Sequence, residues 1–141
     1  MTLTIKRVDA TKENVAALLA WLQIESLPGD LPLDVSGGAW WVLYVDGNPA
    51  GFCSIKRSSR WSNAGYLCRA GVLRKFRGNG LQKKLIAVRV RYAKREGWDW
   101  VTSDTCNNPA STNNLISCGF KMYIPSHKYA GEGTCYWRKR L

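Results

Sequence analysis

A change in hydrophobic periodicity around residues 78–80 constrains the fold of this chain more than any other feature of its sequence. Residues 65–73 have the composition of a strand, whereas Leu81, Leu85, Val88 and Tyr92 recur at the spacing of a helical stripe. Two glycines, in Gly78-Asn79-Gly80, stand between the two patterns. The sequence therefore predicts a strand, a glycine turn and a long helix in direct succession.

Strand and helix patterns also alternate through the rest of the chain. An opening strand is expected over residues 3–8, followed by a helix that Thr11 would cap. Residues 26–38 are predicted to be a loop because they hold two prolines and three glycines. The other predicted elements are strands at 40–45, 49–55, 98–105, 120–124 and 134–138, and a short helix at 111–118.

A hairpin is the strongest local signal for the sheet. Asp46-Gly47-Asn48 joins two of the predicted strands, and Asp-Gly supplies the positive φ angles of a tight turn. The element order β-α-β-β-β-α-β-α-β-β predicts a mixed α/β fold with a mostly antiparallel sheet, in which the strands flanking the long helix form any parallel pair. A chain of 141 residues is expected to form a single domain over residues 1–141.

Composition excludes several classes of protein. With 45% hydrophobic residues, including seven Trp, the chain is expected to fold into a globule. No stretch approaches eighteen consecutive apolar residues and the start is polar, so we expect a cytoplasmic protein that makes no membrane contact. Five cysteines without a C-x-x-C pair, and His127 as the one histidine, predict reduced thiols and no metal site.

Charge is unevenly distributed along the chain, whose formal net charge is +11. Residues 13–55 contain five acids and no Lys or Arg, whereas residues 56–141 carry 18 bases and four acids. This division is typical either of ordinary solvated surfaces or of a molecule with a basic end for an anionic ligand and an acidic end for a cationic one.

The glycine turn has the chemistry of a phosphate-binding loop. Glycine allows positive φ and close approach of the main chain, and the amides at a helix N-terminus attract anions. Five bases lie within residues 74–84. A Walker A loop is excluded, as is G-x-G-x-x-G, which would need glycine where Lys83 stands. An ordinary basic turn is the alternative.

Three segments together resemble the GNAT superfamily of acetyl-CoA-dependent N-acetyltransferases. They are Val72 to Gln82, which is similar to the signature R/Q-x-x-G-x-G/A after a fourth strand, Asn107-Asn108-Pro109-Ala110-Ser111, and Cys118-Gly119-Phe120. The resemblance implies a GNAT-like domain with splayed fourth and fifth strands flanked by helices. It also implies acetyl-CoA as the acetyl donor, a primary amine as acceptor, and no metal.

The resemblance further implies residue roles in donor binding. Main-chain groups of one strand segment would pair with the pantetheine arm and the thioester, the loop would cradle the pyrophosphate, and an asparagine would contact the pantetheine arm. These positions are, in order, Ala70, Gly71 and Val72; Arg77, Gly78, Asn79, Gly80, Leu81 and Gln82; and Asn108.

Two positions depart from the family pattern. Gln82 stands where the signature ends in Gly or Ala, and Leu115 stands where many members carry a tyrosine that protonates the leaving thiolate. Asp104 is our first candidate for the general base and Glu25 the second. The candidates for the acid, besides water, are Ser111, Tyr123 and Tyr129.

The acidic stretch suggests the chemistry of the acceptor. In the family, the first helix and the loop after it border the acceptor cleft, and here that loop holds Asp30 and Asp34 without a nearby base in sequence. We therefore expect a cationic acceptor: a polyamine, an aminoglycoside-like amine, or a lysine or N-terminus in a basic protein segment. Residues 123–129, which include His127, would form the other wall.

Two alternatives use the basic half of the chain. An aminoacyl-tRNA acetyltransferase would hold RNA with basic residues and exposed aromatics such as Trp61 or Trp137. A non-catalytic RNA-binding or inhibitory protein on a degenerate GNAT fold is the second alternative. The chain is expected to be a monomer, or a homodimer paired through its last strands.

Overall fold

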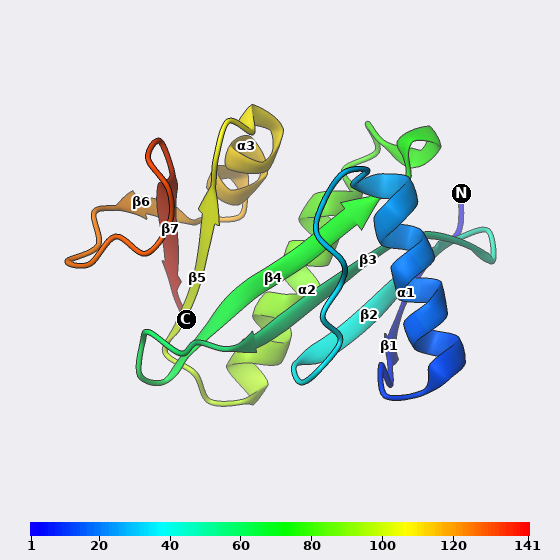
Figure 1. The fold of residues 1–141 in the computed structure, drawn as a ribbon, viewed down its shortest axis with the longest axis horizontal. Helices are drawn as coiled ribbons and strands as arrows, with labels where there is room; N and C mark the ends of the chain where they lie inside the picture. The colour runs from blue at the N-terminus through cyan, green and yellow to red at the C-terminus, as the bar shows by residue number, and fades with distance from the viewer. The chain divides into compact units, whose positions relative to one another are not determined.

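The computed structural model describes all residues 1–141, and its elements follow the predicted order (Figure 1). The seven strands have the sheet order β1-β2-β3-β4-β5-β7-β6. This confirms the predicted α/β fold with a mostly antiparallel sheet. The elements are β1 Leu3–Val8, α1 Glu13–Ser26, β2 Ala39–Val45, β3 Asn48–Arg57, β4 Ala64–Val72, a 3-10 turn at Arg74–Phe76, α2 Leu81–Arg95, β5 Trp100–Thr105, α3 Pro109–Ser117, β6 Lys121–Tyr123 and β7 Cys135–Arg140.

The chain divides into two compact units. The first unit comprises residues 1–56 and 68–85, and the second comprises residues 57–67 and 86–141. Strand β4 and helix α2 each begin in one unit and continue into the other. None of the helices is long and apolar enough to cross a membrane. All five cysteines are free thiols.

The predicted hairpin of the first unit is confirmed. Asp46 and Gly47 have φ angles of 49° and 82°, as a two-residue hairpin turn with the twist of its strands requires. Strands β2 and β3 pair antiparallel on either side of it, with Val45 opposite Asn48. Strand β1 pairs antiparallel with the other edge of β2.

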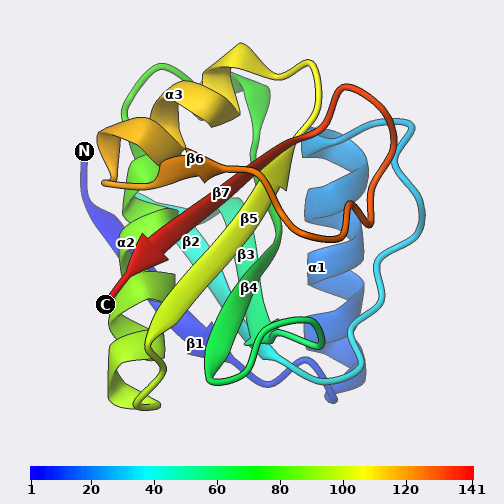
Figure 2. The same cartoon turned by 90° about the vertical axis from the view of Figure 1, so that its left-hand side faces the viewer.

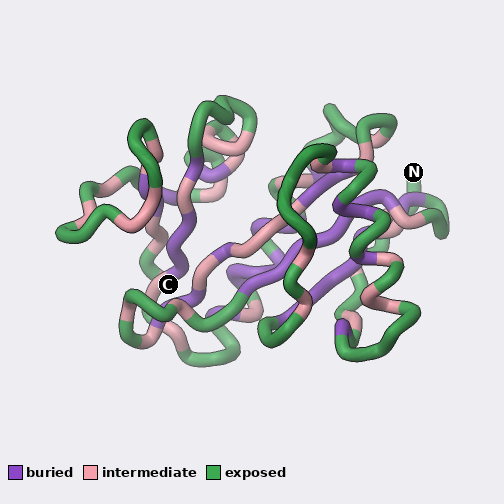
Figure 3. Tube along the Cα trace, in the orientation of Figure 1, coloured by how far each residue is buried: buried purple, intermediate pink, exposed green.

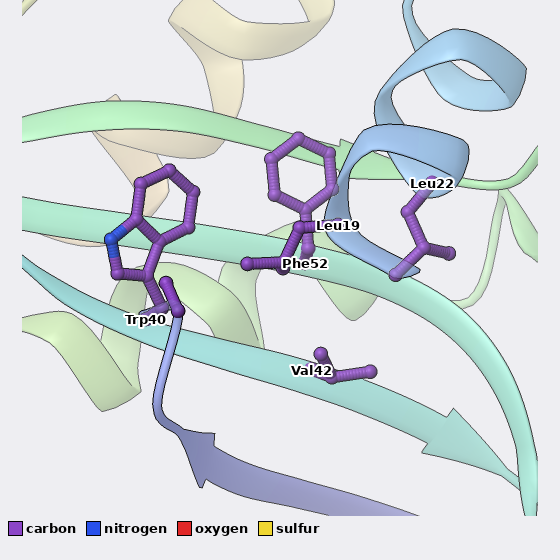
Figure 4. Packing of buried hydrophobic residues seen from close by; sticks show 6 residues of the cluster. Leu19, Leu22, Trp40, Val42 and Phe52 are labelled. Atoms are coloured by element: carbon purple, nitrogen blue, oxygen red, sulfur yellow. The ribbon is translucent and has the colours of Figure 1, made fainter. Parts of the chain in front are cut away.

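Helix α1 covers one face of the strands of the first unit (Figure 4). Leu19 and Leu22 of the helix pack with Trp40, Val42 and Phe52 of β2 and β3, and all five side chains are buried. Burial of each such side chain contributes about 1.5–3 kcal/mol. Figure 3 shows the same concentration of buried residues along β2 and β3.

The second unit contains the one parallel pair of strands. Ala64 to Tyr66 of β4 pair with Trp100 to Thr102 of β5, which confirms the prediction for the strands that flank the long helix. Strand β7 lies between β5 and β6 and is antiparallel to both (Figure 2).

Two expectations about single residues are wrong. Thr11 does not cap α1, which begins at Glu13 after Lys12 and has no side-chain cap; the Thr11 hydroxyl donates instead to Asp9 over 2.6 Å. Trp137 is not an exposed aromatic, because it is only 5% exposed and its Nε1 donates to the Thr105 hydroxyl over 2.9 Å. Its ring therefore belongs to the core of the second unit.

Candidate functional site

The glycine loop of the first unit presents unobstructed main chain at the start of α2. Gly78 and Gly80 have φ angles of 83° and 71°, and a Cβ added at either would meet nothing within 4 Å. Helix α2 begins directly after Gly80, so its first amides have no partner within the helix. The positive end of the helix dipole is added to those amides, and the loop can therefore hold an anion.

The polar side chains of the loop differ in their positions. Asn79 is exposed and closes a local turn, since its Nδ2 donates to the Phe76 carbonyl over 2.9 Å. Arg74, Lys75, Lys83 and Lys84 are exposed, and Gln82 is half-buried. The four exposed bases form a cationic rim, and the Gln82 side chain occupies the place where the family signature has a small residue.

Arg77 is engaged with the protein itself. Its Nε donates to the Val72 carbonyl over 3.0 Å, and its Nη2 donates to the Ser26 carbonyl over 2.7 Å. The guanidinium therefore lies between the end of β4 and the end of α1.

Gly71 allows α1 to approach β4 closely. A Cβ at this position would lie 2.1 Å from Ser26 Oγ and 3.0 Å from Phe52 Cε1. No larger residue fits there without a shift of the helix or the strand. The first unit thus brings Ala70, Gly71 and Val72 together with the glycine loop and the end of α1.

The acidic loop after α1 is tied down at two places. The Leu31 carbonyl accepts hydrogen bonds from Gln23 Nε2 and from Arg69 Nη1. Asp34 Oδ1 accepts from the Ser36 amide over 2.9 Å and from the Ser36 hydroxyl over 2.6 Å, and these bonds lower the pKa of Asp34. Asp30 and Glu25 are exposed.

Asp104 lies in the second unit among tyrosines. Its Oδ2 accepts from the Tyr66 hydroxyl over 2.7 Å and from the Tyr129 hydroxyl over 3.0 Å. The Arg60 guanidinium lies 3.8 Å from the centroid of the Tyr129 ring. Burial, and then the nearby Asp104 carboxylate, raise the pKa of Tyr129 well above its ordinary value. Sequence reasoning missed Tyr66, because only the pairing of β4 with β5 brings it beside Asp104.

The remaining predicted residues lie elsewhere in the second unit. Asn108 caps α3, with its Oδ1 accepting from the Ser111 amide over 3.1 Å, so Ser111 lies in the first turn. Tyr123 is half-buried, and burial is the main cause that raises its pKa. His127 is exposed. The structure contains no group of three or more His, Cys, Asp or Glu side chains that could hold a metal ion.

The fold is similar to the folds of several solved acetyltransferases. An acetyltransferase of Bacillus subtilis in complex with CoA has a TM-score of 0.76 and 16% identity, covering 99% of this chain and 99% of that one. The ribosomal-protein-S18-alanine N-acetyltransferase of Escherichia coli has a TM-score of 0.77 and 13% identity, covering 99% and 94%. The IAA acetyltransferase of Bacillus cereus has a TM-score of 0.76 and 17% identity, covering 99% and 100%.

The sequence itself identifies the family. Residues 9–120 match the model of the acetyltransferase (GNAT) family, and the chain belongs to it. A search of curated proteins found no match. The resemblance of the glycine loop and of the segments around Asn108 and Gly119 is therefore confirmed at the level of the family.

Acetyl-CoA is the acetyl donor of GNAT enzymes, and the loop fits it. The positive φ angles and open space at Gly78 and Gly80 expose main-chain amides at a helix N-terminus, as a pyrophosphate requires. Exposed Lys83 and Lys84 add positive charge beside them.

Proposed function

We propose that this chain is an N-acetyltransferase that moves an acetyl group from acetyl-CoA to a primary amine, on a cationic small molecule or a basic protein segment. The observation that carries the proposal is the loop around Gly78 and Gly80, whose open main chain precedes a helix of 15 residues. Family membership supports the same conclusion.

In this proposal the donor is held mainly by main-chain groups. Ala70, Gly71 and Val72 pair with the pantetheine arm and polarise the thioester carbonyl, while residues 77–82 bind the pyrophosphate. Asn108 contacts the pantetheine arm. The Gln82 side chain adds an amide beside the phosphates.

The transfer needs one proton acceptor and one proton donor. Acetyl-CoA supplies the thioester: the acceptor nitrogen forms the C–N bond, the C–S bond breaks, and the CoA thiolate takes up a proton. Asp104 accepts the proton of the amine, with Glu25 as the second candidate. The two tyrosine hydroxyls engage Oδ2 of Asp104, which leaves Oδ1 for that proton. Ser111, Tyr123, Tyr129 and water are the candidates for the acid that protonates the thiolate.

The acceptor is bound through the acidic loop. Asp30 and Asp34 attract its positive charge, and Asp30 is the better placed of the two because the Asp34 carboxylate already holds Ser36. We infer a cationic acceptor from these two exposed carboxylates, although Arg69 and Lys56 also lie beside the loop. Monomer or homodimer, and the cytoplasm as compartment, remain predictions.

Thermal unfolding with acetyl-CoA, ATP or NAD tests the proposal. At a hundredfold excess over Kd, acetyl-CoA should stabilise the fold by about 2.7 kcal/mol. Gly80→Glu should abolish that shift. Gly133→Glu is the matched control, since Gly133 also has positive φ and open space, in a loop of the second unit. An equal shift with all three anions would refute the proposal.

A cluster in the second unit favours RNA as a second candidate partner. The Arg138 guanidinium lies 4.9 Å, 5.2 Å and 5.9 Å from the ring centroids of Tyr123, Trp100 and Trp61. Arginines beside aromatic rings on a basic surface are typical of single-strand RNA binding. This candidate includes an aminoacyl-tRNA acetyltransferase and a non-catalytic RNA-binding or inhibitory protein.

The salt dependence of RNA binding, together with the response to acetyl-CoA, separates these candidate functions. RNA binding should weaken steeply with salt, and Arg138→Gln should lower the slope by about one phosphate contact. RNA binding together with thermal stabilisation by acetyl-CoA would favour the aminoacyl-tRNA acetyltransferase. RNA binding without that stabilisation would favour the non-catalytic protein.

A further inference from the structure

Arg77 is used differently from the other bases of the glycine loop. Its guanidinium donates to the carbonyl of Val72, the last residue of β4, and to the carbonyl of Ser26, the last residue of α1. One side chain therefore joins the end of a strand and the end of a helix to the loop. Arg74 and Arg77 are both exposed, but the Arg74 side chain makes no hydrogen bond of this kind.

The chemistry of both acceptors suits an arginine. The Ser26 carbonyl is one of the last carbonyls of α1, which have no partner within the helix and carry the negative end of its dipole. A planar guanidinium can donate to two carbonyls in fixed directions at once, which a lysine ammonium on a flexible stem does poorly. The two hydrogen bonds, of 3.0 Å and 2.7 Å, use this property.

A second arginine ties the other end of the same segment. Arg69, on β4, donates to the Leu31 carbonyl, so residues 26–31 are held at both ends by arginines of the donor-binding strand and loop. Ser26 also packs closely against Gly71 of β4. Asp30 lies within the tied segment.

We propose that Arg77 is a positioning residue that holds segment 26–31 against the donor-binding strand, so that binding of the donor and placement of the acceptor-side loop are coupled. Its guanidinium acts on protein carbonyls and not as a phosphate ligand, while its main chain remains part of the pyrophosphate-binding loop. The assignment of donor and acceptor sides rests on the proposed function.

Hydrogen exchange of the unliganded protein tests this positioning role of Arg77 without any substrate. We expect the hydrogen-bonded amides of Leu27 and Asp30 to exchange about tenfold faster in Arg77→Gln and in Arg77→Lys, while the amides of β5 and β7 stay unchanged. Arg74→Gln, which removes the same charge from an exposed side chain, should exchange like the wild type. Wild-type exchange in Arg77→Lys would overturn the proposal.

Ligand titration gives a second readout. Acetyl-pantetheine lacks the pyrophosphate. If Arg77 is a positioning residue, Arg77→Gln should therefore weaken the binding of acetyl-CoA and of acetyl-pantetheine by similar factors. Loss of affinity for acetyl-CoA alone would make Arg77 a phosphate ligand and overturn the proposal. If the wild type binds neither compound, the proposed function fails. The hydrogen-exchange comparison still tests the positioning role of Arg77 in that case. If Arg77→Gln does not fold, Arg77→Lys carries both measurements.

Discussion

The hydroxyl of Tyr129 donates a 3.0 Å hydrogen bond to Oδ2 of Asp104, the same oxygen that receives the Tyr66 hydroxyl. Tyr129 belongs to the irregular segment between β6 and β7, whereas Asp104 lies on β5. The bond therefore fastens that segment to the sheet of the second unit. It also surrounds one carboxylate oxygen with two phenols.

This contact predicts a pH dependence of stability. Because the folded state raises the pKa of Tyr129, it holds the phenol proton more tightly than the unfolded chain, whose tyrosines titrate near pH 10. The stabilisation is present below that pH and is lost as pH rises above it. We expect Tyr129→Phe to lose less stability than the wild type between about pH 9 and 11, measured as urea midpoints. Tyr44→Phe is the control, and identical profiles for wild type and Tyr129→Phe would contradict the prediction.

Gly71→Ala should destabilise the first unit through overpacking. The new Cβ would lie 2.1 Å from Ser26 Oγ and 2.9 Å from Ser26 Cβ. We expect a loss of about 1–3 kcal/mol in the free energy of unfolding, measured in urea. Adding Ser26→Gly should restore part of it. Gly131→Ala, where a Cβ meets nothing within 4 Å, should be near neutral; an equal loss at both glycines would rule out the steric cause.

Asp30→Asn should raise the KM for a cationic acceptor more than the KM for acetyl-CoA. Asp30 is exposed, so its charge is screened and the increase should be about two- to fivefold. Asp34→Asn should act in the same direction. Steady-state kinetics at two salt concentrations check this, with Glu13→Gln as the control, and an unchanged acceptor KM in both variants would remove the acidic loop from acceptor binding.

Thr105→Val should destabilise the second unit. Thr105 Oγ1 accepts from Trp137 Nε1 and lies 3.0 Å from Thr112 Oγ1, which links β5, β7 and α3. Valine preserves the volume but leaves the buried indole N–H unpaired, at a cost of about 1–3 kcal/mol. Thr105→Ser keeps the hydroxyl and should recover most of the loss in urea unfolding. If serine and valine cost the same, the hydrogen bond is not the cause.

Local chemistry explains which parts of the fold were predictable. The turn at Asp46-Gly47 and the start of α2 after Gly80 both depend on positive φ angles that few residues adopt, and the structure has them at those positions. Gly97, two residues after the end of α2 at Arg95, has a similar positive φ of 77°. These signals are confined to a few neighbouring residues.

The less predictable features depend on contacts between distant residues. The tyrosine partners of Asp104 come from positions 66 and 129, and only strand register and the path of a loop bring them together. Thr11 has a side chain that could cap a helix, but its hydroxyl donates to the Asp9 carboxylate instead. Trp137 has a strand-like neighbourhood that is equally compatible with exposure, and only the position of β7 between β5 and β6 buries it beside Thr105. The candidate catalytic and acceptor-binding roles remain predictions.

The strand order β5-β7-β6 has a consequence for the time course of folding. Strand β6 is synthesised before β7 but has β7 as its strand partner, so it cannot join a sheet until residues 135–140 exist. Closing this loop requires ordering of the irregular segment that carries Tyr129, and non-local pairings of this kind slow folding. The second unit should therefore complete its sheet late in synthesis, after the hairpin at Asp46-Gly47 has already formed in the first.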